Sequence, residues 1–206
     1  MSKITNVGVH IVESADAISD TAGEGQIWVK SDAPSSLYYT DDAGTDFRMG
    51  GITLGANTAT TSGTSIDFTS IPSGVKKLTF MFAGISTNGT SDMILQLGDS
   101  GGFENSGYVG RIDHFAATEV WSGEGADIIQ DVVAADLSGG TMIMHLEDAT
   151  NNTWMFMGIG DAGASGTIVS NSAGYKSLSG ELTQLRLTTE GGSAVFDAGA
   201  AAIQFQ

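Results

Sequence analysis

Residues 62–111 read SGTSIDFTSIPSGVKKLTFMFAGISTNGTSDMILQLGDSGGFENSGYVGR, and this stretch decides the fold class. Two segments in it, Lys77–Ile85 and Asp92–Gly98, alternate large apolar residues with others at a period of two. That period places successive side chains on opposite faces of a β-strand. Between them, Ser86–Ser91 is rich in Ser, Thr, Asn and Gly, which is typical of a turn. The apolar side chains that we expect to form the core are Leu78, Phe80, Phe82, Met93, Leu95 and Leu97.

Working outward, strand signals recur at intervals of roughly ten residues from Gly63 onward, as in a β-sandwich. The further predicted strands are Ser65–Thr69, Gly107–Ile112, Thr141–Glu147, Thr153–Ile159, Gly166–Ser170, Tyr175–Leu178, Glu181–Thr189, Ala194–Asp197 and Ala201–Gln206. Glu190–Ser193 is predicted to be a hairpin turn. Thr118–Asp136 is the least β-like part, with a helical turn expected at Ala126–Ala135. Residues 51–206 are therefore predicted to form a jelly-roll-like β-sandwich.

The N-terminal residues 1–50 differ in character from the rest. Residues 1–24 are weakly patterned and predict an arm that is ordered only when docked. Gly25–Gly50 predicts a three-stranded β-meander, which is too small to be stable alone. Its apolar and aromatic side chains would be buried if several copies packed together. The residues of this predicted oligomer interface are Trp28, Leu37, Tyr38, Tyr39 and Phe47.

Charge and composition exclude several classes of function. The chain of 206 residues has 24 acidic and 8 basic residues, a formal charge of −16. Binding to nucleic acid or to an anionic membrane surface needs clustered Lys and Arg, so neither partner is expected. The absence of cysteine excludes disulfides and thiolate metal sites. We also expect no secretory signal and no membrane insertion, since no apolar segment approaches the ~20 residues of a membrane span.

The string Gly98-Asp99-Ser100-Gly101-Gly102 surrounds the nucleophile in trypsin-like proteases, in which a His and an Asp precede the Ser. Here only His10 precedes Ser100, and Phe103 replaces the proline that follows in that family. We therefore interpret the string as a Gly-rich turn after a strand. A hydrolase using Ser100 is kept as a third alternative.

No other stretch predicts catalysis, a cofactor or a metal ion. Asp113-His114 with Glu119 lacks clear ligand spacing, and Asp41, Asp42 and Asp46 lack the full pattern of a calcium loop. We interpret the first group as surface residues and the second as a hairpin turn.

Aromatic side chains in or beside loops can stack on sugar rings. The candidates for such a glycan contact are Tyr108, Trp121 and Tyr175. The alternative for each is packing in the core or in a subunit interface.

Two stretches resemble structural proteins of tailed bacteriophages, many of them from marine hosts. Gly25–Gly50 is similar to a short module found near tail-fibre and virion-surface domains of such phages. Ser62–Arg111 resembles a β-domain of the same proteins, in which Gln-Leu-Gly-Asp-Ser-Gly-Gly is followed by Gly-Tyr. Gly180–Gln206 is similar to the closing hairpin of that domain, including Phe-Asp-Ala-Gly.

This resemblance implies a homotrimeric virion protein without catalytic residues, made in the bacterial cytoplasm and placed on the virion surface. We expect a short fibre or spike that contributes to host adsorption, in which residues 1–50 bind other virion proteins and residues 51–206 face outward, with a host glycan as a potential partner. The alternative is a capsid decoration protein that stabilises the head.

Overall fold

A computed structural model describes residues 11–19, 23–31, 36–49, 51–114, 117–130, 132–162 and 169–206. The chain forms two compact units, Met1–Gly51 and Ile52–Gln206. Much of the predicted arm, including His10, lies outside the described residues. Within them, no helix is both long enough and apolar enough to cross a membrane.

The smaller unit is a four-stranded sheet in the order β1-β2-β3-β4. Its strands are Glu13–Ser14 (β1), Gln26–Lys30 (β2), Ser36–Thr40 (β3) and Asp46–Met49 (β4). The short strand β1 is parallel to β2, whereas β2, β3 and β4 form an antiparallel meander. The turn before β4 is held by Asp41, whose carboxylate accepts hydrogen bonds from the backbone N–H groups of Ala43 and Thr45 at 3.0 and 2.8 Å. Asp41 therefore acts in a hairpin turn, as predicted.

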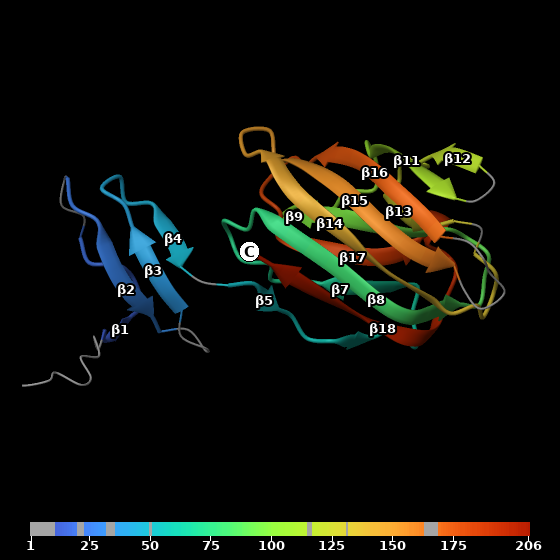
Figure 1. Cartoon of the computed structure of the whole chain (residues 1–206), viewed down its shortest axis with the longest axis horizontal. Coiled ribbons are helices and arrows are strands. Elements are labelled where there is room, and N and C mark those ends of the chain that lie inside the picture. The colour runs from blue at the N-terminus through green and yellow to red at the C-terminus, as the bar shows by residue number, and fades with distance from the viewer. Residues whose placement is uncertain are drawn as a thin grey trace, which may run out of the picture. The chain divides into compact units, whose positions relative to one another are not determined.

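The larger unit is a sandwich of two antiparallel sheets (Figure 1). Among the described residues, the larger sheet has nine strands in the order β12-β11-β16-β15-β14-β8-β18-β5, and β6 also pairs with β18. They are Thr53–Leu54 (β5), Thr58–Ala59 (β6), Lys77–Thr87 (β8), Val109–His114 (β11), Ala117–Val120 (β12), Ser138–Asp148 (β14), Thr153–Ala162 (β15), Val169–Ser177 (β16) and Phe196–Phe205 (β18).

The smaller sheet of the sandwich has the order β10-β9-β17-β7, and β13 also pairs with β9. Its strands are Ser65–Phe68 (β7), Met93–Asp99 (β9), Gly102–Phe103 (β10), Ala126–Ile129 (β13) and Gln184–Thr189 (β17). The chain passes repeatedly from one sheet to the other, for example from β7 to β8 and from β8 to β9. The predicted all-β class, with a sandwich preceded by a small meander, is confirmed.

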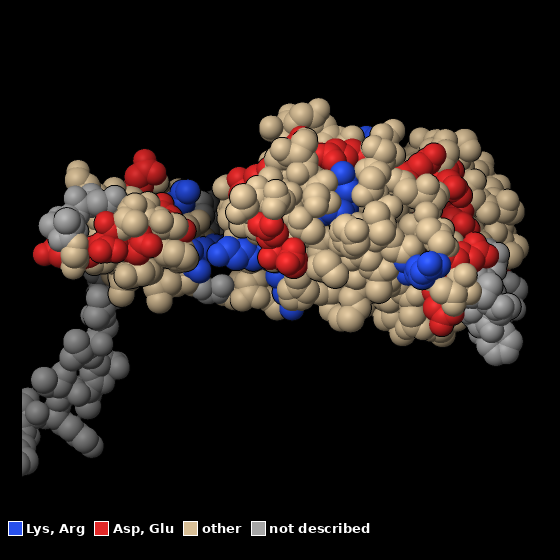
Figure 2. All heavy atoms as spheres, turned by 90° about the horizontal axis from the view of Figure 1, so that it is seen from above, with Lys and Arg blue, Asp and Glu red and all other residues tan. Residues whose placement is uncertain are grey.

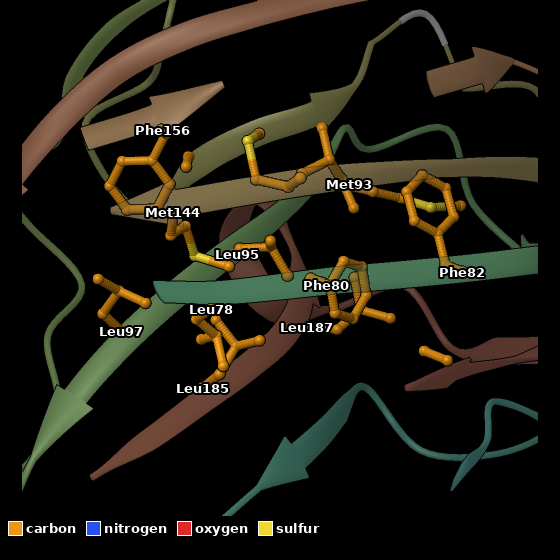
Figure 3. Close-up of a cluster of buried hydrophobic side chains, with 14 of the residues drawn as sticks. Leu78, Phe80, Phe82, Met93, Leu95, Leu97, Met144, Phe156, Leu185 and Leu187 are labelled. Atoms are coloured by element: carbon orange, nitrogen blue, oxygen red, sulfur yellow. The ribbon is translucent and has the colours of Figure 1, made fainter. Parts of the chain in front are cut away.

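The core lies between the two sheets and is centred on the stretch 62–111. Leu78 and Phe80 of β8 and Leu95 and Leu97 of β9 are fully buried. Figure 3 shows these side chains together with those of β14, β15 and β17 in one cluster. Each large side chain buried in this way stabilises the fold by about 1.5–3 kcal/mol. Alternation along β8 and β9 therefore identifies the strands that hold the sandwich together.

Several local predictions were wrong. Gly166–Ser170 and Tyr175–Leu178 were predicted as separate strands, but Ser170 and Tyr175 lie in one strand, β16. In the same way, Ala194–Asp197 and Ala201–Gln206 were predicted as two strands but both overlap one strand, β18. Ala126–Ala135 was expected to form a helical turn, but Ala126–Ile129 is strand β13, whose four residues are all buried. A fully buried strand shows no alternation of apolar and polar residues, so its period cannot be distinguished from that of a helix. Glu190–Ser193 was expected to be a hairpin turn, but Glu190–Gly192 is a 3₁₀ turn that connects β17 of the smaller sheet to β18 of the larger one.

Candidate functional site

The outer face of the larger sheet is unusually apolar. Strand β15 turns Trp154 and Phe156 into the core and Met155, Met157 and Ile159 outward. These and the other large apolar residues on the same side are 44 to 63% exposed. We call this surface the apolar outer face and define it by Val109, Val120, Met155, Met157, Ile159, Val169 and Tyr175.

The strand register joins part of this surface, whereas Arg111 lies between Val120 and Ala173, and the row of Ile159 continues with Asn171 and Asp113. Met155 is paired with Tyr175, and Tyr175 with Val109, so these three side chains form one row across β15, β16 and β11. Met157 pairs with Ala173 in the next row. Neighbouring side chains in such rows are about 5 Å apart. Figure 2 shows one side of the larger unit, on which acidic side chains outnumber the few basic ones.

The smaller unit also has an uncovered apolar face. Ile27, Tyr39 and Phe47 are paired across β2, β3 and β4, and Leu37 pairs with Met49 in the next row. These five residues are 37 to 59% exposed. Tyr39 and Phe47 stack with their ring centroids 6.3 Å apart. Three residues of the predicted oligomer interface, Leu37, Tyr39 and Phe47, therefore share one face.

The other two residues of that predicted interface lie on the opposite face. Trp28 and Tyr38 stack at 5.0 Å, and the Lys30 ammonium lies 5.5 Å from the Tyr38 ring centroid. Trp28 Nε1 donates to Thr40 Oγ1 at 2.8 Å, and that hydroxyl donates to Asp46 Oδ1 at 2.6 Å. Trp28 is thus already buried and hydrogen-bonded within a single chain, and it has no need of a second copy.

The prediction of a glycan contact is wrong for Tyr108 and Trp121, each of which is 4% exposed. Tyr108 Oη accepts from the backbone N–H of Leu97 at 2.6 Å and donates to the carbonyl of Glu104 at 3.1 Å. Burial raises the pKa of this hydroxyl above its usual range. Neither ring presents a face to a sugar, because both pack against Phe156. Tyr175 remains available at 45% exposure, but it belongs to the apolar outer face.

The Gly-Asp-Ser-Gly-Gly string forms a turn between β9 and β10. Asp99 accepts hydrogen bonds from the backbone N–H of Gly101 at 2.7 Å and from Ser179 Oγ at 2.6 Å. These hydrogen bonds, that from Ser179 first, hold the pKa of the Asp99 carboxyl below its usual value. Ser100 is exposed at the tip of the turn. The described His145 lies on β14 of the larger sheet, whereas Ser100 follows β9 of the smaller one.

The acidic residues considered as metal ligands do not converge. Asp113 Oδ1 accepts from the hydroxyl of Thr118 at 2.8 Å. Within the described ranges, no three His, Cys, Asp or Glu side chains are placed to hold a metal ion.

The sequence reasoning missed the apolar outer face, although a signal was present. Residues 154–159 read WMFMGI, so large apolar side chains alternate with other large apolar side chains rather than with polar ones. A strand that is apolar on both faces indicates burial on both faces. Among the described residues, only one of the two sides of β15 is covered.

Comparison with protein-family models, with curated proteins and with solved structures finds no match for this chain.

Proposed function

We propose that the protein is a non-enzymatic structural protein of the bacteriophage virion surface, which associates with copies of itself and displays its β-sandwich. The observation that carries this proposal is the apolar outer face of the larger sheet. Large apolar side chains that gather on an exposed face of a soluble protein mark a candidate surface of association. The resemblance of Gly25–Gly50 and Ser62–Arg111 to phage structural proteins supports the setting.

Two features favour another copy of this chain as the occupant of the face. The rows of the face include Arg111, opposite Ala173, Asp113, opposite Asn171, and Asp161, opposite Val169, so both charge signs lie among the apolar residues. A surface with both signs can present a patch of one sign to a patch of the other sign on the next copy, as the head-to-tail contacts of a closed trimer require. The methionines at its centre adapt their shape to a partner because their side chains are unbranched.

The smaller unit supports the same proposal independently. A sheet of four short strands is marginal in water when one face stays exposed. Packing Leu37, Tyr39 and Phe47 against their counterparts in other copies would supply the missing burial. Each unit thus offers one apolar face for a homotrimer of the kind that the phage resemblance implies.

The proposed role on the virion is a short fibre or spike that contributes to host adsorption. Multiple copies per assembly and per particle would raise avidity without tight single contacts. A decoration protein that stabilises the capsid would use the same apolar faces, so the location on the particle distinguishes the two roles.

The test is the location of the protein on purified virions. Antibodies raised against residues 52–206 and viewed by electron microscopy should label an appendage of the tail or a fibre on the head. Labelling spread evenly over the head would assign the protein to capsid decoration instead. Virions that contain no trace of the chain, by labelling and by mass spectrometry, would contradict the proposal.

A further inference from the structure

We propose that a polar groove on the outer side of the smaller sheet of the sandwich binds a neutral sugar unit of a glycan. The inference rests on the proposed function for its biological setting, since it supplies the adsorption step with a ligand class. The groove has a volume of about 330 Å³. This lies at the lower end of the range for ligand sites, about 300–1,000 Å³, and suits one or two sugar rings.

The groove is built from the sheet and from several loops beside it. Gln96 of β9 and Arg186 and Thr188 of β17 contribute from the strands. Glu124 and the glycines of the 3₁₀ turn, Gly191 and Gly192, contribute from the loops. A Cβ atom built on either glycine would meet no atom within 4 Å, so this wall is open.

The charged side chains of the groove are held in place before any ligand arrives. Arg186 donates from Nε and Nη2 to the two carboxylate oxygens of Asp67 at 2.7 and 2.8 Å. Its guanidinium carbon lies 4.1 Å from the ring centroid of Phe103. This double hydrogen bond and the ring contact fix the plane of the guanidinium group.

Hydrogen bonds also tie the loop wall to the sheet. Glu124 Oε2 accepts from the backbone N–H of Gly191 at 3.0 Å, and the Glu124 carbonyl accepts from Gln96 Nε2 at 3.1 Å. Thr188 Oγ1 donates to the carbonyl of Thr64 at 2.9 Å. Because these groups are fixed, a ligand would lose little free energy in ordering them.

The chemistry of the lining selects the ligand class. Amide, hydroxyl, carboxylate and guanidinium groups offer donors and acceptors that match the paired hydroxyls of a sugar. Asp67 neutralises Arg186, and Glu124 leaves the groove with a negative charge, in a chain of net charge −16. An anionic ligand would therefore be repelled. An apolar ligand would remove water from the remaining donor and acceptor positions of the lining without replacing it, which is costly. A neutral, hydroxyl-rich ligand meets neither penalty.

Each groove should bind weakly. A hexose has about 12 non-hydrogen atoms, and at the binding efficiency typical of drug-sized ligands this corresponds to a dissociation constant in the millimolar range. Stable attachment to a glycan-bearing surface would then require several grooves of an assembly to bind at the same time.

The test is binding of the full-length protein to a printed array that holds neutral glycans and sialylated or uronic-acid glycans. The wild-type protein should bind a subset of the neutral glycans and give a signal at least threefold weaker on their sialylated or uronic-acid counterparts. Asn105 is exposed and lines the groove, so Asn105→Trp should fill it and reduce the neutral signal at least tenfold. The matched control is Asn151→Trp, at an exposed turn position between β14 and β15, which should leave the signal unchanged.

A second variant tests the charge argument. Glu124→Gln keeps an oxygen for the Gly191 N–H but removes the negative charge. The ratio of neutral to sialylated binding should fall about threefold, the effect of one unit charge at about 6 Å in water. A wild-type protein that binds no neutral glycan, or an Asn105→Trp protein that binds like the control, would overturn the proposal. Either result would leave the virion location and the self-association of the chain unaffected, because those are measured separately.

Discussion

Asp127 shows how one residue can set the pH response of the fold. It lies on β13 and is only 2% exposed. Its Oδ2 accepts from Gln130 Nε2 at 3.1 Å, while its Oδ1 has no hydrogen-bond partner among the described residues. Burial, together with the negative charges of Asp92 and Glu190, raises the pKa of this carboxyl to about 7. A buried carboxyl with so few hydrogen bonds to its charged form favours its protonated form.

We predict that Asp127→Asn weakens the pH dependence of stability. The pKa in the folded state exceeds the ordinary value of 3.8, so between these limits the folded chain holds a proton that the unfolded chain has released. The free energy of unfolding therefore falls as the pH rises from about 4 to about 7. Denaturant unfolding at pH 5 and at pH 8 gives the free energy of unfolding of both proteins. Between these pH values, the difference between variant and wild type should change by about 2 kcal/mol in favour of the variant. A difference between the two proteins that is the same at both pH values would contradict this account.

At the turn after β9, the residues of the protease-like string should contribute very unequally to the free energy of unfolding. Asp99→Ala removes the acceptor of two hydrogen bonds and leaves the Gly101 N–H and the Ser179 hydroxyl without it. We expect a loss of about 1–3 kcal/mol in the free energy of unfolding. Ser100→Ala, at the exposed tip, should change it by less than about 0.5 kcal/mol. Chemical denaturation of the two variants is the measurement, and equal effects would show that the turn is not held by Asp99.

Among the elements, the pair β11–β16 is specialised to accommodate Trp121. Gly110 and Gly174 are paired partners in these strands. A Cβ atom on Gly110 would lie 2.5 Å from the Trp121 ring, and one on Gly174 would lie 2.4 Å from it. The indole therefore packs directly on the backbone of two strands, while its Nε1 donates to Ser172 Oγ at 3.1 Å.

We predict that Gly174→Ala destabilises the sandwich by about 1–3 kcal/mol, because neither the indole nor the Val109 carbonyl, 2.4 Å from the added Cβ, can move away freely. The matched control is Gly139→Ala on β14, where the nearest atom would be 3.5 Å away, an ordinary contact. Thermal unfolding of both variants separates the two cases. A Gly174→Ala melting temperature equal to that of Gly139→Ala would show that the strands adjust at no cost.

The alternation of large apolar residues with other residues predicted strands such as β8 correctly from the sequence. The core residues Leu78, Phe80 and Phe82 on β8 could be assigned from the sequence because Lys77, Thr79 and Met81 separate them. The same reasoning failed on β13, where Asp127 is buried among apolar neighbours and no period is visible. The pairing of strands was not predictable either, because β8 and β9 are adjacent in sequence but belong to different sheets.

The candidate site was only partly predictable for a related reason. A sequence reveals that Tyr108 and Trp121 are aromatic, but not that long-range packing buries both. Conversely, the groove around Arg186 joins β9, β17 and several loops that are far apart along the chain. Such a site has no local signature. The signal for the apolar outer face lay within the single strand β15 and was in principle readable.

At the scale of the whole molecule, net charge opposes the association that the apolar faces favour. Each copy has a formal charge of −16, so bringing copies together concentrates negative charge. Raising NaCl from 0.05 to 0.5 M shortens the screening length several-fold and should tighten self-association. Sedimentation velocity at both salt concentrations is the measurement. Weaker association at high salt would indicate that opposite charges, rather than apolar faces, hold the copies together.

The central claim is that the apolar outer face is a contact between copies of this chain, and the most direct test is the solution mass by light scattering. We predict the mass of three chains for the wild-type protein and dissociation for Met157→Lys, since that variant places an unpaired charge in the contact. Val133→Lys, at a similarly exposed apolar residue in a loop outside the face, should keep the wild-type mass. A monomeric wild-type protein, or a Met157→Lys protein of unchanged mass, would contradict the claim.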